Sequence, residues 1–338
     1  MTHRATSTIT AVAPGRVNLI GEYTDIADGL VLPMAIDLAT TVCGQRGGDQ
    51  VVITSASEPD PAVVALDVTD PAAITPSWAR YVAGVIAELA PDEGFRGHVT
   101  TTLPLGAGLS SSAALEVSVA LALGFRGTPL ELAQLTQRAE QRSSGVPCGI
   151  MDQLASSSGV AGHALLIDCH HLSVEPVLLP ADIEVRVIHS GQSRSLAGSE
   201  YGERRRAVEA AEATLGPLRL VRDLGLVDQL EDDVLRRRAR HVVSENERVR
   251  TVAAALASGD LPTVGEAMAA SHASLRNDFE VSTPILDTLV ERLLATPGVI
   301  GARLTGAGFG GCVVALTHPG ALSEGWLVQA ADGAQVTV

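Results

Sequence analysis

Short runs of β-branched residues, separated by polar turns, fill the first hundred positions and predict β-strands. We expect strands over residues 8–12, 17–20, 41–42, 51–54 and 97–103, because Gly, Asp and Pro clusters bound each run. The first part of the chain is therefore predicted to be rich in strands.

Apolar residues at helical spacing begin at residue 78. Residues 78–89, 110–123 and 129–143 each place apolar side chains three or four positions apart, which predicts three helices. The second is apolar on most faces and is expected to be buried. Before the third, Thr128 stands where a helix cap belongs, and Glu131 follows three positions later, so the two residues are expected to form a capping box.

The second half of the chain has a different organisation. Strand-like residues 163–169 and 183–189 flank a connection that contains proline, and we expect a domain boundary there, dividing the chain into residues 1–180 and 181–338. The remaining pattern predicts helices over 199–215, 234–258, 261–275 and 283–295, then strands over 302–305 and 312–316. The whole pattern indicates a mixed α+β protein with two domains.

Charge and composition exclude several classes of function. The net charge of -15 would repel nucleic acid or an anionic membrane. The chain contains no lysine, so a P-loop lysine and a Schiff-base lysine are both ruled out. Its arginine runs at 204–206 and 236–238 lie among acidic residues and are interpreted as solvated helix faces.

Cysteine usage and hydropathy indicate where the protein works. The four cysteines show neither CxxC spacing nor a disulfide framework, which suits a reducing compartment. No apolar signal core and no run of about 18 apolar residues is present. We expect a cytoplasmic protein.

The stretch PLGAGLSSSAALEV, residues 104–117, has the pattern of a phosphate loop. Gly106, Gly108 and three serines lie between a predicted strand and a predicted helix. Unpaired N–H groups at a helix start and the helix dipole favour an anion there. The alternative is a tight glycine turn in which Ser110 only caps a core helix.

A second glycine-rich stretch, LTGAGFGGCVVAL at 304–316, formally matches GxGxxG. A dinucleotide fingerprint needs a helix after the glycines, whereas a strand-like run follows here, so we reject that interpretation. The stretch is either a hairpin turn or a loop that approaches a ligand.

Two further stretches place carboxylates in loops. APGRVNLIGEYTDIADG, residues 13–29, combines Arg16 with Glu22, Asp25 and Asp28. A Ca²⁺ site of the EF-hand type is not indicated, because the EF-hand spacing is absent. The stretch is either a solvated acidic turn or a site whose carboxylates bind sugar hydroxyls. GVPCGIMDQLAS, residues 145–156, holds Asp152 in apolar surroundings, either as a helix cap or as a half-buried acid that needs a cationic partner such as Arg16.

Taken in order, these stretches resemble the GHMP small-molecule kinases, and their galactokinase branch in particular. The family motif GRxNxIGEHTDYxxG corresponds to residues 15–29, PxGxGLSSSAA to 104–114, CGIMDQ to 148–153 and TGxGFGGCxV to 305–314. SEYxxRR, RARHVVxENxR and SHxSLRxDFEVSxPxLD fall at 199–205, 238–248 and 271–287. The resemblance implies a two-domain α+β fold. Its N-terminal domain would be like the second domain of ribosomal protein S5, its C-terminal domain would be ferredoxin-like, and the active site would lie between them.

The resemblance also implies a role for each matching residue. Asp152 would face the anomeric hydroxyl of a sugar, with Arg16 beside it, and these two would be the catalytic residues. The implied activity is that of an ATP-dependent sugar 1-kinase whose expected substrate is galactose. The implied sugar contacts are Glu22, Tyr23, Asp25, Gly149 and Tyr201. The implied ATP contacts are Trp78, Gly106, Ala107, Gly108, Leu109, Ser110, Ser111 and Ser112, and the implied Mg²⁺ ligands are Ser112 and Glu140.

The chain departs from the family at the sugar loop. Galactokinases carry His and Tyr where this chain has Tyr23 and Ile26. By resemblance Tyr23 lies near the C6 hydroxyl, so a sugar altered at C6 (L-arabinose, a deoxy sugar or a uronic acid) is the alternative substrate. A non-catalytic sensor of sugar and ATP is a further alternative, although the chain keeps Asp152, Arg16 and Glu140. We expect a monomer, or else a dimer, whose partners are small molecules rather than nucleic acid or membrane.

Overall fold

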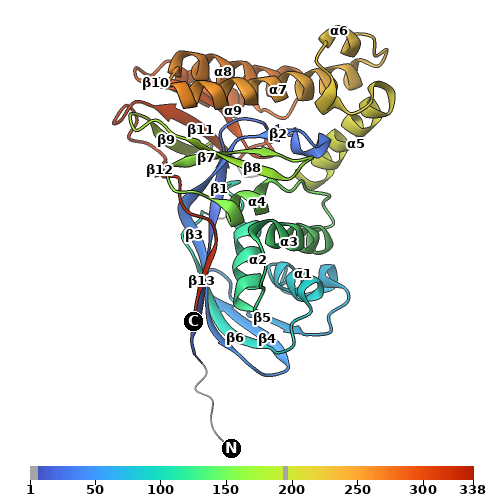
Figure 1. The fold of residues 1–338 in the computed structure, drawn as a ribbon, viewed down its shortest axis with the longest axis vertical. Coiled ribbons are helices and arrows are strands. Elements are labelled where there is room, and N and C mark those ends of the chain that lie inside the picture. The colour runs from blue at the N-terminus through green and yellow to red at the C-terminus, as the bar shows by residue number, and fades with distance from the viewer. Residues whose placement is uncertain (1–6, 105, 193–196) are drawn as a thin grey trace, which may run out of the picture.

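The structure is a computed structural model. It describes residues 7–104, 106–192 and 197–338, and residues 197–199 are described by their backbone alone. A strand-rich N-terminal half lies below a helix-rich C-terminal half when the long axis is vertical (Figure 1). The boundary expected near residue 180 stays a prediction. The chain end crosses it, because the last strand returns to the first sheet.

The largest sheet has six strands in the order β13-β1-β3-β6-β4-β5. Its strands are β1 (Ile9–Asn18), β3 (Pro33–Arg46), β4 (Gln50–Ser55), β5 (Ala62–Ala65), β6 (Phe95–Thr101) and β13 (Gln335–Thr337). The strands predicted over 8–12 and 17–20 are one continuous strand, β1. Its pairing with β3 shifts register between Pro14 and Arg16. This irregularity coincides with Gly15, where the sequence pattern predicts a break between two strands.

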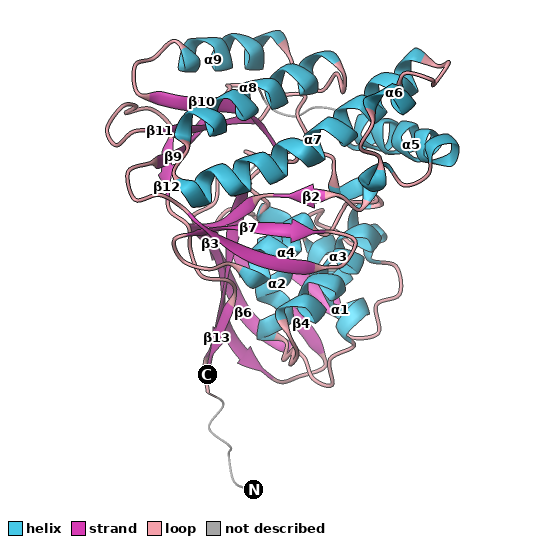
Figure 2. Cartoon of the chain, turned by 45° about the horizontal axis from the view of Figure 1, so that its top comes forward, coloured by secondary structure: helices cyan, strands magenta, loops and turns pink. Residues whose placement is uncertain are grey.

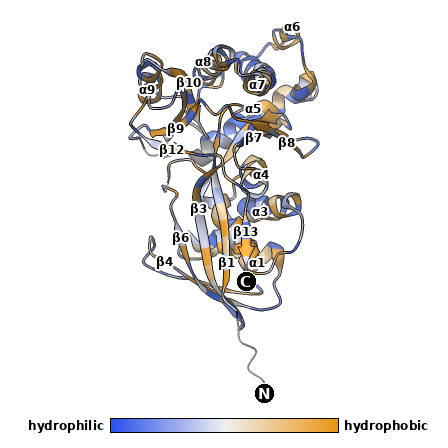
Figure 3. Cartoon of the chain, turned by 60° about the vertical axis from the view of Figure 1, so that its left-hand side comes forward, coloured by the Kyte–Doolittle hydropathy of each residue, from blue (hydrophilic) through white to orange (hydrophobic). Residues whose placement is uncertain are grey.

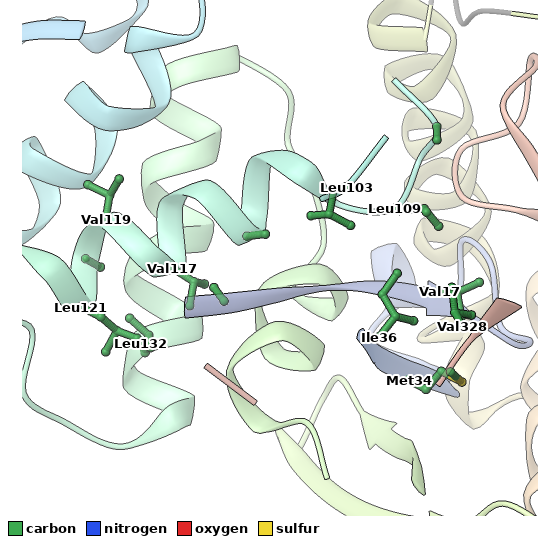
Figure 4. Close-up of a cluster of buried hydrophobic side chains, with 14 of the residues drawn as sticks. Val17, Met34, Ile36, Leu103, Leu109, Val117, Val119, Leu121, Leu132 and Val328 are labelled. Atoms are coloured by element: carbon green, nitrogen blue, oxygen red, sulfur yellow. The ribbon is translucent and has the colours of Figure 1, made fainter. Parts of the chain in front are cut away.

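Four helices pack beside this sheet: α1 (Ala79–Leu89), α2 (Ser111–Ala122), α3 (Pro129–Ser144) and α4 (Met151–Ser158). The predicted capping box is confirmed, because Thr128 accepts a bond from Glu131 N–H and the Glu131 side chain accepts one in return. Val117 of α2 and Val17 of β1 belong to the same buried cluster as Leu109 (Figure 4). This core fixes the start of α2 against β1.

Two smaller sheets and a further layer of helices complete the fold. β2 (Leu30–Val31), β7 (His163–Asp168) and β8 (Ser173–Leu178) form one sheet. β10 (Val299–Thr305), β11 (Cys312–Thr317), β9 (Glu184–His189) and β12 (Trp326–Val328) form the other, in that order. The helices are α5 (Ala197–Leu215), α6 (Leu224–Val227), α7 (Asp233–Ser258), α8 (Leu261–Asn277) and α9 (Pro284–Leu294).

Helices α8 and α9 lie against the sheet that contains β10, and α7 packs beside α8 (Figure 2). They carry hydrophilic and hydrophobic segments side by side (Figure 3), as expected of helices with one face on a core. Helix α7 also contacts β2 and β8. It therefore packs on residues of the first half of the chain as well as on its own layer.

The interpretation of the arginine runs as solvated helix faces is wrong for two of the residues. Arg238 is 3% exposed and donates to Glu280 Oε2 at 2.5 Å. Arg204 donates to the carbonyl oxygens of Phe279 and Glu280 at 2.9 and 2.8 Å. The partners, residues 279 and 280, lie more than forty positions away along the chain. The acidic residues near the arginine runs in the sequence therefore gave no indication of them. Across the described ranges, no helix is both long and apolar enough to span a bilayer.

Candidate active site

A pocket of about 140 Å³ gathers residues from both halves of the chain. Its lining includes all seven of the residues expected to face the sugar: Arg16, Glu22, Tyr23, Asp25, Gly149, Asp152 and Tyr201. These residues come from β1, the loop after it, the start of α4 and α5. The roles implied for them remain predictions, but the fold brings them to one place.

Arg16, which is buried, and Asp152, which is half-buried, form an ion pair in the lining of this pocket. Arg16 Nε and Nη2 lie 2.7 and 2.5 Å from Asp152 Oδ1, and Arg16 Nη1 donates to Gly108 O at 2.7 Å. A β-carbon at Gly15 would lie only 2.5 Å from Leu109 O, so glycine allows β1 to approach the phosphate loop closely. Asp152 lies in the first turn of α4 and uses its side chain for this pair, which excludes the simple helix-cap interpretation.

Ser110 connects the same carboxylate to the phosphate loop. Its Oγ donates to Asp152 Oδ2 at 2.5 Å. Ser110 has a left-handed backbone, with φ of 60°, and its side chain does not cap α2. A non-glycine residue in this region carries strain that its surroundings must offset. Asp152 is therefore held through both oxygens, by Arg16 and by Ser110.

Asp25 and Gly149 also meet in the lining of the pocket. A β-carbon at residue 149 would lie 1.9 Å from Asp25 Oδ2, so only glycine leaves room for this carboxyl. Burial raises the pKa of Asp25 to about 7, and the negative charges of Asp152 and Glu22 add to the effect. Asp25 is half-buried and lines the pocket, so a polar ligand there could hydrogen-bond to this carboxyl.

Tyr23 closes the pocket toward the C-terminal half. Its phenol donates to Ala307 O at 2.6 Å, and its ring lies 4.5 Å from the ring of Phe279 and 5.3 Å from that of Tyr201. Ile26, the other departure from the family motif, is buried beside it in the same apolar cluster. The substituted residue is thus fixed by packing and by one hydrogen bond.

A second pocket, of about 250 Å³, lies beside the start of α2. Trp78, Ser111 and Ser112 line it, together with Tyr81 of α1. Gly106 and Gly108 have φ of 73° and 79°, and a β-carbon at Gly106 would meet no atom within 4 Å. Ala107 and Leu109, also expected to contact ATP, are each 1% exposed and belong to the buried apolar cluster, so their predicted contact with ATP stays a prediction.

The two expected metal ligands are adjacent. Ser112 Oγ donates to Glu140 Oε1 at 2.8 Å, while Glu140 Oε2 accepts from Gln153 at 2.5 Å. Burial raises the pKa of Glu140 to about 7, and the nearby charge of Asp152 contributes. In the described part of the chain no set of three His, Cys, Asp or Glu side chains is arranged for a metal, so a cation here would need non-protein ligands as well.

Glu22 lines the first pocket, which we call the sugar pocket after the role expected of it, but protein groups already occupy both of its oxygens. Oε1 accepts from Gly306 N–H at 2.6 Å and from Thr305 Oγ1 at 3.2 Å. Oε2 accepts from Asn18 Nδ2 at 2.6 Å and from Arg303 Nη2 at 2.5 Å. The structure therefore gives Glu22 a role in holding the halves of the chain together, whether or not it also meets a ligand.

The glycine-rich loop at 304–316 supplies site residues that sequence reasoning did not name. Gly306 and Ala307 line the pocket, between β10 and β11. A strand follows the glycines, so the rejection of a dinucleotide fingerprint is confirmed. The sequence left two interpretations open, a hairpin turn or a loop that approaches a ligand. In the structure this segment connects β10 to β11 and also lines the pocket.

Comparison with known proteins identifies the family. The galactokinase galactose-binding signature matches residues 2–46, the GHMP kinases N terminal domain matches 79–160 and the GHMP kinases C terminal domain matches 252–326. A galactokinase of Homo sapiens is 45% identical, over 96% of this chain and 91% of the relative. The chain belongs to the galactokinase family of GHMP kinases.

Other galactokinases and solved structures agree with this assignment. A galactokinase of Chloroflexus aurantiacus is 47% identical over 90% of this chain and 83% of its own length. The structure of Lactococcus lactis galactokinase complexed with galactose superposes with a TM-score of 0.90 at 32% identity, covering 97% of this chain and 95% of that one. A mevalonate kinase, at 19% identity and a TM-score of 0.67 over 92% of each chain, shares the fold. The two-domain α+β GHMP kinase fold is thereby confirmed.

Proposed function

We propose that this galactokinase-family chain transfers the γ-phosphoryl group of ATP to the anomeric hydroxyl of galactose, giving α-galactose 1-phosphate. The observation that carries the proposal is the position of Asp152, which lines the sugar pocket and is bonded to Ser110 of the phosphate loop. The acceptor hydroxyl and the terminal phosphate can meet only at such a junction.

Asp152 is placed to orient the attacking hydroxyl and to accept its proton. Arg16 holds one carboxylate oxygen and so fixes the direction of the other. Because phosphoryl transfer passes through a loose transition state, positioning and neutralisation of charge contribute more than proton abstraction. Arg16 supplies positive charge between Asp152 and Gly108 O, at the edge of the phosphate loop.

The phosphate loop can hold a triphosphate without lysine. The first N–H groups of α2 have no partner within the helix, and Ser110 leaves them free because its side chain turns to Asp152. These groups and the helix dipole favour negative charge at this end. Trp78 and Tyr81 offer apolar surface in the adjoining pocket for the adenine ring.

The residues at Ser112 and Glu140 fit a magnesium ion. They are hard oxygen donors in contact with each other, and the buried Gln153 Oε1 beside them has no hydrogen-bond partner among the residues that the structure describes. When bound there with ATP, Mg²⁺ would neutralise charge on the phosphates. The protein residues alone do not complete an octahedral site, so phosphate oxygens and water would supply the rest.

A second substrate is supported by Tyr23. Its hydroxyl is bonded to Ala307 O at 2.6 Å and closes one wall of a small pocket, which would favour a sugar with less bulk at C6. The test is a panel of galactose, 6-deoxygalactose and L-arabinose with ATP and Mg²⁺, measured as kcat/KM from ADP release. A clear preference for galactose supports the main proposal, and a preference for the truncated sugars replaces it with the second. Absence of turnover with every sugar would contradict both and favour a sensor.

A further inference from the structure

A cluster of buried polar side chains lies behind the sugar pocket, between the two halves of the chain. We call it the buried hub. Its members are Asn18, Glu22, Glu245, Ser271, Arg303 and Thr305, all of which are at most 2% exposed. They come from β1, the loop after it, α7, α8 and β10.

Arg303 is the centre of the hub. It is completely buried. Its guanidinium donates one hydrogen bond to a side chain of the C-terminal half and three to groups of the N-terminal half. Nε donates to Ser271 Oγ at 3.1 Å. Nη1 donates to Asn18 O and Leu19 O at 3.3 and 3.1 Å, and Nη2 donates to Glu22 Oε2 at 2.5 Å.

One of these bonds reaches Glu22, within residues 21–30, which we call the sugar loop, and two others hold the carbonyls of Asn18 and Leu19 just before it. Three of its residues have positive φ: Gly21 at 101°, Tyr23 at 66° and Asp28 at 53°. Tyr23 and Asp28 are not glycine, so this conformation is strained and must be imposed by the surroundings. Two of the pocket residues, Tyr23 and Asp25, depend on it for their direction.

Helix α7 provides a second set of attachments. Glu245 Oε1 accepts from Gly21 N–H at 3.0 Å and from Ser271 Oγ at 2.6 Å. Asn246 Oδ1 accepts from Leu30 N–H at 2.7 Å. The sugar loop is thus attached at both ends to α7 and at its second residue to Arg303, all from the C-terminal half.

We propose that Arg303 is a positioning residue for sugar binding, which holds the sugar loop in its strained conformation through Glu22 and the carbonyls of Asn18 and Leu19. It lines neither pocket and acts only through these groups. The sugar half of the site is therefore set by the C-terminal domain, whereas the phosphate loop is built within the N-terminal one.

The chemistry of the hub requires a guanidinium. Lysine could pair with Glu22 as a point charge but could not reach the carboxylate and two carbonyls from one rigid plane. Loss of the positive charge leaves Glu22 buried and uncompensated, which is strongly destabilising in folded proteins. The test therefore uses a conservative variant and a charge-neutral pair as well as a simple deletion.

The experiment compares Arg303→Lys, Arg303→Met, Glu22→Gln and the double variant Arg303→Met/Glu22→Gln with the wild type. For each we would measure the KM for galactose, the KM for ATP, kcat and the melting temperature. This test rests on the proposed function. If wild type fails to turn over galactose, that function is refuted, and the Arg303 variants are then compared by calorimetric affinity for galactose and by ATP affinity.

Arg303→Met is expected to raise the galactose KM at least about tenfold and to leave the ATP KM within about twofold. Arg303→Lys is expected to give a smaller rise, about threefold to tenfold. The double variant should recover melting temperature relative to Arg303→Met without recovering the galactose KM. Strong non-additivity of the two single substitutions is expected, because both act through one bond.

Arg46→Met is the matched control. Arg46 also donates to two backbone carbonyls, Ala122 O and Leu121 O, at the end of α2, and touches neither pocket. It should lower the melting temperature and leave the galactose KM unchanged. The proposal is overturned if folded Arg303 variants keep a normal galactose KM, or if the ATP KM rises in parallel. Failure of Arg303→Lys to fold would also overturn it, by assigning Arg303 to core stability alone.

Discussion

Ser110 donates a hydrogen bond of 2.5 Å to Asp152, and so joins the loop expected to hold ATP to the acid expected to face the sugar. The bond exists because Ser110 has φ of 60° and does not cap the helix that it precedes. This contact joins directly two segments that lie 42 residues apart in the chain, and Arg16 bridges the same two segments through Asp152 and Gly108 O.

Removal of that hydroxyl tests the coupling. Ser110→Ala and Ser110→Gly should each lower kcat about tenfold or more, since a lost hydrogen bond to a charged group is worth about 1.5–3 kcal/mol. Glycine relieves the left-handed strain, so equal losses in both variants would isolate the hydroxyl as the cause. Ser118→Ala, within α2 and with a hydroxyl that donates to Leu115 O, is the control and should keep normal turnover. Normal kcat in Ser110→Gly would refute the role.

Gly149 should not tolerate a side chain. In Gly149→Ala the added carbon would lie 1.9 Å from Asp25 Oδ2 and must displace that carboxyl. We expect the galactose KM to rise about tenfold or more with the ATP KM unchanged, as befits a loss of sugar contacts alone. Gly202→Ala has its nearest neighbour at 3.4 Å and should behave as wild type. Equal kinetics in the two variants would show that Asp25 does not need its present position.

The metal assignment predicts a specific defect in Glu140→Gln. The substitution keeps the shape of the side chain and removes its charge, so the Mg²⁺ concentration for half-maximal activity should rise about tenfold. Glu88→Gln, whose carboxylate pairs with Arg138 and Arg142 on the surface, is the control. An unchanged Mg²⁺ titration in Glu140→Gln would place the ion elsewhere.

Buried His241 predicts a pH-dependent contribution to stability. Burial lowers its pKa to about 4, whereas the unfolded chain titrates near 6.5. The unfolded state therefore binds more protons between these values, and the free energy of unfolding contributed by His241 falls as pH decreases through that window. The full effect is on the order of 3 kcal/mol.

Asp25 acts in the opposite direction, because its raised pKa makes the folded state bind the extra proton between about pH 4 and 7. The measurement is therefore the difference between wild type and His241→Gln in denaturant unfolding at pH 7.5 and pH 5. The wild type should lose more stability than the variant on acidification. Exposed His318→Gln should match the wild type, and a parallel loss in wild type and His241→Gln would contradict the account.

Local features of this protein could be predicted from its sequence, and long-range partners could not. The Thr128–Glu131 capping box depends on residues three positions apart and was predicted correctly. The partners of Glu22 at Arg303, Thr305 and Gly306 lie about 280 positions away. Nothing in an acidic, glycine-flanked loop indicates that its glutamate is bonded from another domain.

The arginine runs show the same limit. Arg238 stands between charged residues that suggest a solvated face, yet packing of α7 against residues 278–280 buries it. The split of β1 into two predicted strands has a local cause, since the glycine at position 15 reads as a turn but serves a close approach. The candidate site residues could be named because family motifs preserve their order, and their roles stay predictions, whereas spacing alone left the interpretations open.

The most direct test of the central claim is the phosphorus NMR spectrum of the product made from galactose, ATP and Mg²⁺ by wild type and by Asp152→Asn. We predict that wild type gives a single new phosphate ester coupled to the anomeric proton. The folded, ATP-binding Asp152→Asn variant should form this ester at least about a hundredfold more slowly. A phosphate on any other hydroxyl, or near-normal turnover by Asp152→Asn, would contradict the account.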